Sequence, residues 1–75
     1  MKALKELGLN QIMIARELNV ERQAVNAWFT GRRFPSAGTM QKLHKAINNL
    51  TGKIYSLADI YNLLEKAIAE HKEVG

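Results

Sequence analysis

Three observations predict an all-α domain of five helices. Apolar residues recur three and four positions apart, which is the period of a helix, and no segment alternates as a half-buried strand would. Glycine, proline and capping residues separate these periodic segments, at the places where helices should end. The 75 residues, of which 47% are hydrophobic, suffice for one small core. We therefore expect a single compact domain over residues 1–75.

The first two helices are expected to be short. Residues 2–7 form the first, and Gly8 is its expected end. Asn10 is a favourable N-cap for a second helix over residues 11–18, because its side chain can accept a hydrogen bond from the backbone of the first turn.

A third helix, over residues 21–29, follows so closely that it must meet the second at a tight turn. Asn19 occupies that turn, and asparagine tolerates a positive φ better than most residues other than glycine. Ala15 is small, which suits a position where one helix crosses close above the other. Residues three and four apart share a helix face. One core between the two helices is therefore expected from Ile14, Ala15, Leu18, Val20, Val25 and Trp28.

A fourth helix is expected after a loop. Gly31 closes the third helix, and Ser36 then caps a fourth that runs to about Asn49. Its apolar stripe, which would face the core, consists of Met40, Leu43, Ile47 and Leu50.

The fifth helix, over residues 57–71, is the longest. Ser56 and Asp59 resemble a capping box at its start, and its apolar residues follow the helical period closely. The helix either completes the core or pairs with a second copy of the chain. Leu63 adds apolar surface outside the main stripe, which favours pairing, but both roles stay open at this point.

The positive charge of the chain is unevenly distributed. Residues 1–52 hold eight Lys and Arg against three Asp and Glu, whereas residues 53–75 hold three against four. A basic surface attracts polyphosphate and supplies affinity that does not depend on sequence. Because the charge coincides with the predicted helix pair, it favours a nucleic-acid partner over ordinary solubilising charge.

Composition argues against an enzyme, a metal protein and a membrane protein. The absence of cysteine excludes disulfides and thiolate metal sites. Two histidines and seven scattered acidic residues offer no metal-binding or catalytic cluster, and no cofactor is expected. The longest apolar run, residues 12–15, is too short for a signal peptide or a membrane span. We expect a cytoplasmic protein without enzymatic activity.

The outward face of the third helix is mostly polar and consists of Glu21, Arg22, Gln23, Asn26 and Ala27. Arginine, glutamine and asparagine are side-chain types that pair with base edges. Two short helices joined by a tight turn are typical of a helix-turn-helix. The residues themselves therefore indicate a module that binds double-stranded DNA.

Features shared with a known family extend from Leu9 to Thr51. They are Gln11, Ala15, the Asn19-Val20 turn, Val25, Trp28, the Thr30-Gly31-Arg32-Arg33 loop, Pro35-Ser36 and the spacing of Met40, Leu43, Ala46 and Ile47. On these features the chain resembles the Cro/repressor (Xre-type, lambda-repressor-like) helix-turn-helix family of phage and bacterial regulators. The motif covers residues 11–30, and its two helices are the second and third of the chain.

Two positions depart from the family pattern. The family usually has glycine where this chain has Asn19, and a polar or acidic residue where it has Phe29. Trp28 is expected in the core, as the family has a large apolar residue there. Because neighbouring aromatic residues cannot all be buried in so small a domain, Phe29 and Phe34 are expected to cover the loop or to contribute to a subunit contact.

The resemblance implies that the third helix enters the major groove with its first turns. Arg22, Gln23 and Asn26 are then the predicted base-contacting residues, since arginine can bind guanine bidentately and the two amides can bind adenine. Ala27 either contacts a thymine methyl or is small so that the helix can approach closely.

The resemblance also implies phosphate contacts at the two ends of the motif. Gln11 opens the helix that lies across the DNA backbone, although it can also be read as an ordinary solvated first-turn residue. Arg32 and Arg33 lie in the loop that runs near the backbone in the family, and Thr30 can add a hydroxyl contact.

The function expected from the sequence is transcriptional regulation, with repression favoured over activation because the chain is small. A homodimer would bind a palindromic operator with half-sites about 34–36 Å apart. One alternative is a protein-binding module on the same fold, such as an antitoxin or an anti-repressor partner, which the unplaced aromatic residues and the final helix would serve. Another is the DNA-binding part of a longer regulator, which the capped last helix and short charged tail argue against.

Overall fold

Five helices make up most of the computed structural model, which describes residues 1–74. They are α1 (Lys2–Lys5), α2 (Gln11–Leu18), α3 (Arg22–Thr30), α4 (Ala37–Thr51) and α5 (Leu57–Val74). No strand occurs within these 74 residues. The predicted all-α class and the order of five helices are confirmed.

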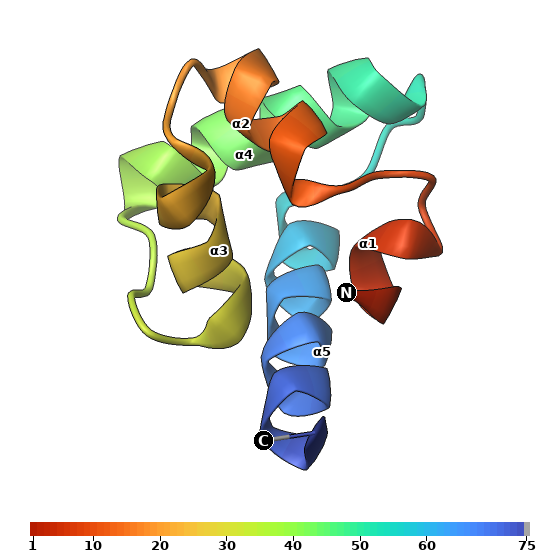
Figure 1. Ribbon diagram of the computed structural model, residues 1–75. Helices are drawn as coiled ribbons and strands as arrows, with labels where there is room; N and C mark the ends of the chain where they lie inside the picture. The colour runs from red at the N-terminus through yellow and green to blue at the C-terminus, as the bar shows by residue number, and fades with distance from the viewer. Residues whose placement is uncertain (75) are drawn as a thin grey trace.

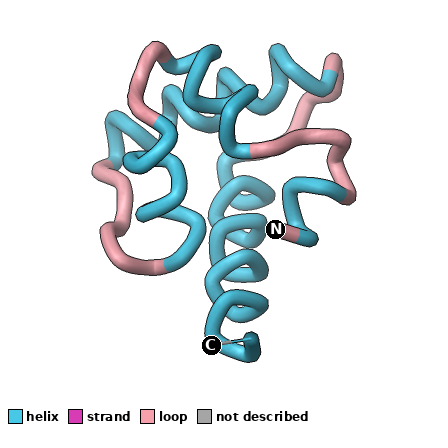
Figure 2. The backbone as a smooth tube through the Cα atoms, in the orientation of Figure 1, coloured by secondary structure: helices cyan, strands magenta, loops and turns pink. Residues whose placement is uncertain are grey.

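The long helix α5 is the axis around which the others are arranged. In Figure 1 it runs down the centre, with α3 on one side and α1 on the other, while α2 and α4 lie across its upper end. Helix α5 packs against α1, α3 and α4, and α2 packs against α3 and α4. Short loops join the helices, including the turn between α2 and α3 (Figure 2). The C-terminal turns of α5 extend beyond the rest of the molecule (Figure 1).

All five helices contribute to one apolar core. The largest fully buried side chains are Leu4, Ile14, Val25, Phe29, Met40, Leu43, Ile47, Ile60 and Leu64. No polar or charged side chain within the described residues is buried with them. The core therefore rests on apolar burial, which contributes about 25 cal/mol per Å² removed from water.

The structure corrects the expectation for Phe29. Its side chain is fully buried, and the neighbouring Trp28 is only 7% exposed. The reason is that α3 packs against both α2 and α5, so its buried sector is wide enough for two adjacent aromatic residues. Phe34 is 58% exposed, and its ring stacks on that of Tyr61 with centroids 6.1 Å apart.

Val20 is the second correction, because it is 40% exposed and does not join the core. It follows Asn19, whose φ of 56° confirms the predicted left-handed turn. The N–H of Val20 donates to the carbonyl of Ala15 at 3.0 Å, which folds the chain back over the end of α2. This turn places the Val20 side chain outside the packed faces of α2 and α3.

Side-chain caps confirm most of the predicted helix starts. Asn10 and Ser36 each accept a hydrogen bond from the N–H three residues later, at 2.9 and 3.2 Å. Ser56 and Asp59 form a reciprocal capping box, with bonds of 2.9 and 3.1 Å. The predicted helix ends are less accurate than the predicted starts, since α1 stops two residues earlier than predicted and α5 continues to Val74.

Polar contacts attach α1 to α5 at both ends of the short helix. The N–H of Ala3 donates to Glu70 Oε1 at 2.9 Å, and Lys66 Nζ donates to Glu6 Oε2 at 2.6 Å. The hydrogen bond from Lys66 holds the pKa of Glu6 below its ordinary value and raises the pKa of Lys66. Helix α1 is thereby held beside α5.

Gly31, which ends α3, lies directly against α5. Its φ is 81°, in the left-handed region that glycine adopts at little cost. A Cβ atom added there would lie 3.1 Å from Ile68 Cγ2. Two constraints, backbone conformation and the close approach of α5, therefore require glycine at this position.

We predict that Gly31→Ala lowers the free energy of unfolding by about 1–2 kcal/mol, because alanine is strained at positive φ and its methyl group meets Ile68. Gly38→Ala is the matched control, since Gly38 lies within α4 and has open space around it. That variant should be about 0.4–1 kcal/mol more stable than the unmodified chain. Denaturant titration measures both, and equal stability of Gly31→Ala and the unmodified chain would contradict the account.

Candidate nucleic-acid interface

The inner face of α3 determines which residues its outer face presents. Val25, Trp28 and Phe29 are buried, so the opposite side of this helix faces solvent. Arg22 and Gln23 are exposed there. The other two predicted base-contacting residues, Asn26 and Ala27, are half-buried on the same helix.

A hydrogen bond between side chains links the two helices of the motif. Gln11 Nε2 donates to Asn26 Oδ1 at 3.1 Å, which joins the first residue of α2 to the middle of α3. The second N–H of the Gln11 amide and the amide nitrogen of Asn26 are left as donors. Both residues are predicted members of the interface, but the bond between them is not predictable from the sequence, because their separation of 15 residues carries no pairing signal.

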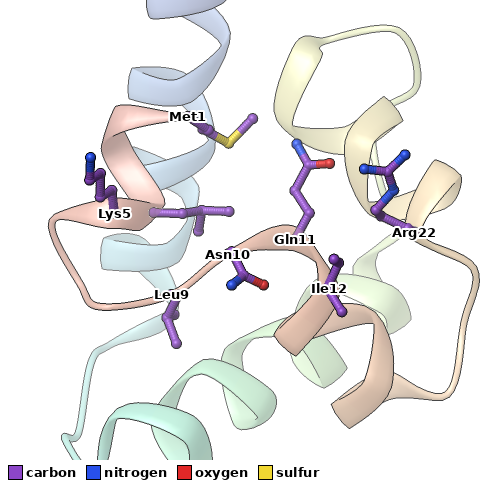
Figure 3. A pocket seen from close by; sticks show the side chains of 8 residues that line it. Met1, Lys5, Leu9, Asn10, Gln11, Ile12 and Arg22 are labelled. Atoms are coloured by element: carbon purple, nitrogen blue, oxygen red, sulfur yellow. The ribbon is translucent and has the colours of Figure 1, made fainter.

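Gln11 and Arg22 open α2 and α3 and lie side by side. Figure 3 shows the Gln11 amide and the Arg22 guanidinium pointing the same way, with Met1 and Lys5, from the N-terminal segment that contains α1, across the hollow from them. The starts of the two motif helices therefore form one polar edge.

The structure gathers most of the predicted site residues around a shallow hollow of about 450 Å³. It is lined by Gln11, Arg22, Gln23, Asn26 and Arg32. These residues come from the start of α2, the first half of α3 and the loop after α3. The hollow unites predicted base contacts with predicted phosphate contacts.

A second hollow shares Gln23 and Arg32 with the first and adds Ala27, Arg33, Ser36 and Thr39. The backbone N–H of Arg33 donates to the carbonyl of Ala27 at 3.2 Å, so the loop folds back against α3. From the sequence, Ser36 was expected only as a helix cap, and Thr39 was not among the predicted site residues. Residue spacing alone does not predict how a loop folds back, which is why both were missed.

Thr30 differs from the other predicted phosphate contacts. Its hydroxyl donates to the carbonyl of Asn26 at 2.8 Å, and the side chain is half-buried. Phosphate oxygens only accept hydrogen bonds, so a contact through this hydroxyl requires the bond to Asn26 to break.

Three arginines give the surface an uncompensated positive charge. Arg22, Arg32 and Arg33 are exposed, and none of them forms an ion pair with a carboxylate among the described side chains. Glu21, at the N-cap of α3, is the nearest acidic residue in the sequence to Arg22. Charges that are free of intramolecular partners remain available for phosphate or for guanine.

Other kinds of site find no support in the described part of the chain. No group of three His, Asp or Glu side chains there is arranged to hold a metal ion. None of the helices over residues 1–74 combines the length and apolar character needed to cross a membrane.

Comparison with known proteins gives one match. A family model described as helix-turn-helix matches residues 1–52, which span α1 to α4 and include all eight predicted site residues. No curated protein and no solved structure gives a match. The family model covers more than half of the chain and agrees with the observed helix pair. The chain therefore belongs to the Xre, lambda-repressor-like helix-turn-helix family of DNA-binding transcriptional regulators.

Proposed function

We propose that this regulator recognises a specific duplex site with α3 in the major groove and represses transcription by occupying a promoter. The observation that carries the proposal is the surface of α3, where Arg22 and Gln23 are exposed and Asn26 is half-buried beside them, while the opposite face is buried. A helix with its side chains is about 10–12 Å across, and the major groove is about 12 Å wide. Helix α3 therefore fits the groove.

The residues of α3 suit different bases. Arg22, at the start of the helix, has two donors for guanine O6 and N7, whereas Gln23 and Asn26 suit adenine. The bond from Gln11 reduces the freedom of the Asn26 amide, so that less entropy is lost when it meets a base. Ala27 leaves room for close approach and offers a methyl group to thymine.

Phosphate contacts would position α3 from both sides of the groove. Gln11 lies in the first turn of α2, where a helix exposes backbone N–H groups that favour an anion. Arg32 and Arg33 lie beyond the other end of the motif, in the loop after α3. Thr30 would join them only after releasing its bond to Asn26.

A homodimer is part of the proposal. One small module rarely reaches a useful ratio of specific to non-specific affinity, whereas two modules on a palindrome double the recognised sequence. The exposed ring of Phe34 stacks on the half-buried Tyr61, and a second copy could cover this pair. The half-sites would lie about 34–36 Å apart.

The exposed apolar side chains also favour a second candidate function, binding to another protein. Ile54 is 97% exposed and Phe34 is 58% exposed, and covering either side chain with a partner would remove apolar surface from water. An antitoxin or an anti-repressor partner would use such a surface. This alternative predicts a stoichiometric protein complex without salt-sensitive DNA binding.

Selection from random-sequence duplexes tests the proposal. We expect an enriched palindrome, and affinity for it that falls steeply as salt rises because phosphate contacts release counterions. The absence of an enriched sequence, together with weak binding at low salt, would favour the protein-binding alternative.

We predict different losses for two arginine variants. Arg22→Ala should weaken binding to the selected site by about 1–3 kcal/mol and leave binding to random duplex nearly unchanged, because it removes a base contact. Arg33→Ala should weaken both about equally and lower the salt slope by about one unit. Fluorescence anisotropy at several salt concentrations separates these effects. Uniform losses in both variants would show that the assigned roles are wrong.

We further predict that Asn26→Asp changes the preferred base. Aspartate keeps an oxygen that can accept the bond from Gln11, but it lacks the amide donor for adenine and accepts instead from cytosine. Repeated selection with this variant should therefore replace adenine with cytosine at one position of each half-site. Asn49→Asp, an exposed position in α4, adds the same charge and should leave the selected sequence unchanged. An unaltered preference in Asn26→Asp would remove Asn26 from the base-reading set.

A further inference from the structure

The interface continues past the helix-turn-helix into a hollow that the family match does not explain. This hollow, of about 610 Å³, lies between the start of α1, the end of α3 and the last turns of α5. It shares part of its lining with the candidate interface and adds residues from α1 and α5; the polar residues around it include Lys2, Gln11, Asn26, Arg32, Glu70 and His71. Since α5 lies outside residues 1–52, the family model does not cover this part of the surface.

The charged groups around the hollow are mainly basic. Lys2 comes from α1, Arg32 from the loop after α3, and His71 from the last turns of α5. Glu70 is the acidic group there, and one of its carboxylate oxygens already accepts a hydrogen bond from the N–H of Ala3. The exposed basic groups also offset the partial negative charge at the C-terminal end of α5.

The position of the hollow follows one strand of the proposed duplex. A helix in the major groove has a DNA backbone on each side of it. Arg33 lines a hollow with Ala24 and Ala27 of α3. Gln11 lines the present hollow with Asn26 and Thr30, which lie along a different strip of the same helix. The hollow extends from Gln11 toward α5, whose last turns project beyond the other helices (Figure 1).

We propose that this hollow binds a backbone phosphate of the strand that passes Gln11, so that α1 and α5 extend the DNA contact beyond the motif. The inference rests on the proposed function, with α3 in the groove. Lys2 and Arg32 supply positive charge, and His71 supplies a ring N–H donor, which even a neutral imidazole carries. The contact does not depend on base identity, and so it raises affinity for all sequences alike.

Two substitutions test the contact, with one matched control. Lys2→Gln and His71→Ala alter exposed side chains at the hollow. Lys53→Gln removes the same charge as Lys2→Gln, but from the loop before α5. The hollow lies near the opposite end of α5, a helix of 18 residues that is about 27 Å long. Equal thermal unfolding midpoints would establish that all three variants are folded.

We expect Lys2→Gln to lower the salt slope by up to about 0.9 and to weaken binding to selected and random duplexes alike by about two- to fivefold. His71→Ala should weaken both without changing which sequence is selected. Ethylation interference should show loss of one phosphate contact outside the half-site in both variants. Lys53→Gln should match the unmodified chain in every measurement.

The possible results distinguish a failure of this inference from a failure of the proposed function. If the unmodified chain selects a site but Lys2→Gln and His71→Ala behave like Lys53→Gln, the hollow contacts no phosphate and the inference is overturned while the proposed function stands. If the unmodified chain shows no salt-sensitive DNA binding, the proposed function and this inference fail together.

Discussion

The anchoring of α3 by its apolar face is the constraint on which the rest of the structure depends. A helix of nine residues is marginal in water by itself, so it must be stabilised by packing. Val25 and Phe29 are fully buried and Trp28 nearly so, which fixes the rotation of α3 about its own axis. That rotation decides that Arg22 and Gln23 face solvent as a pair. The same helix therefore contributes apolar side chains to the core and polar side chains to the proposed DNA-binding surface.

The other elements hold this helix in place. The left-handed Asn19 sets the angle between α2 and α3, and the Gln11–Asn26 bond joins them on the outer side. Helix α5 supports α3 from behind and approaches Gly31 so closely that no larger residue fits without adjustment. Because the described core contains no buried polar side chain, the polar groups of the domain remain at its surface, where the proposed DNA contacts lie.

Local signals made most of the fold predictable, whereas contacts between distant segments did not. The helical period of the apolar residues and the caps at Asn10 and Ser36 were enough to predict the order of the helices and where most of them start. The burial of Phe29 was predicted wrongly because it depends on α5, more than 25 residues later. In the site, spacing along α3 was enough to group Arg22 with Gln23 on one face. The Gln11–Asn26 bond was not predictable, since it depends on how two helices cross.

Amide chemical-shift mapping of the chain with a selected duplex tests the central claim most directly, because it reports which surface meets the DNA. We expect the shifts to concentrate at the start of α2, along residues 22–33 and, through the added phosphate contact, near Lys2 and His71. Shifts confined to the surface around Ile54, Phe34 and Tyr61, with α3 unaffected, would contradict it. That result would mean that α3 stabilises the fold through its buried face but does not contact DNA through its exposed face.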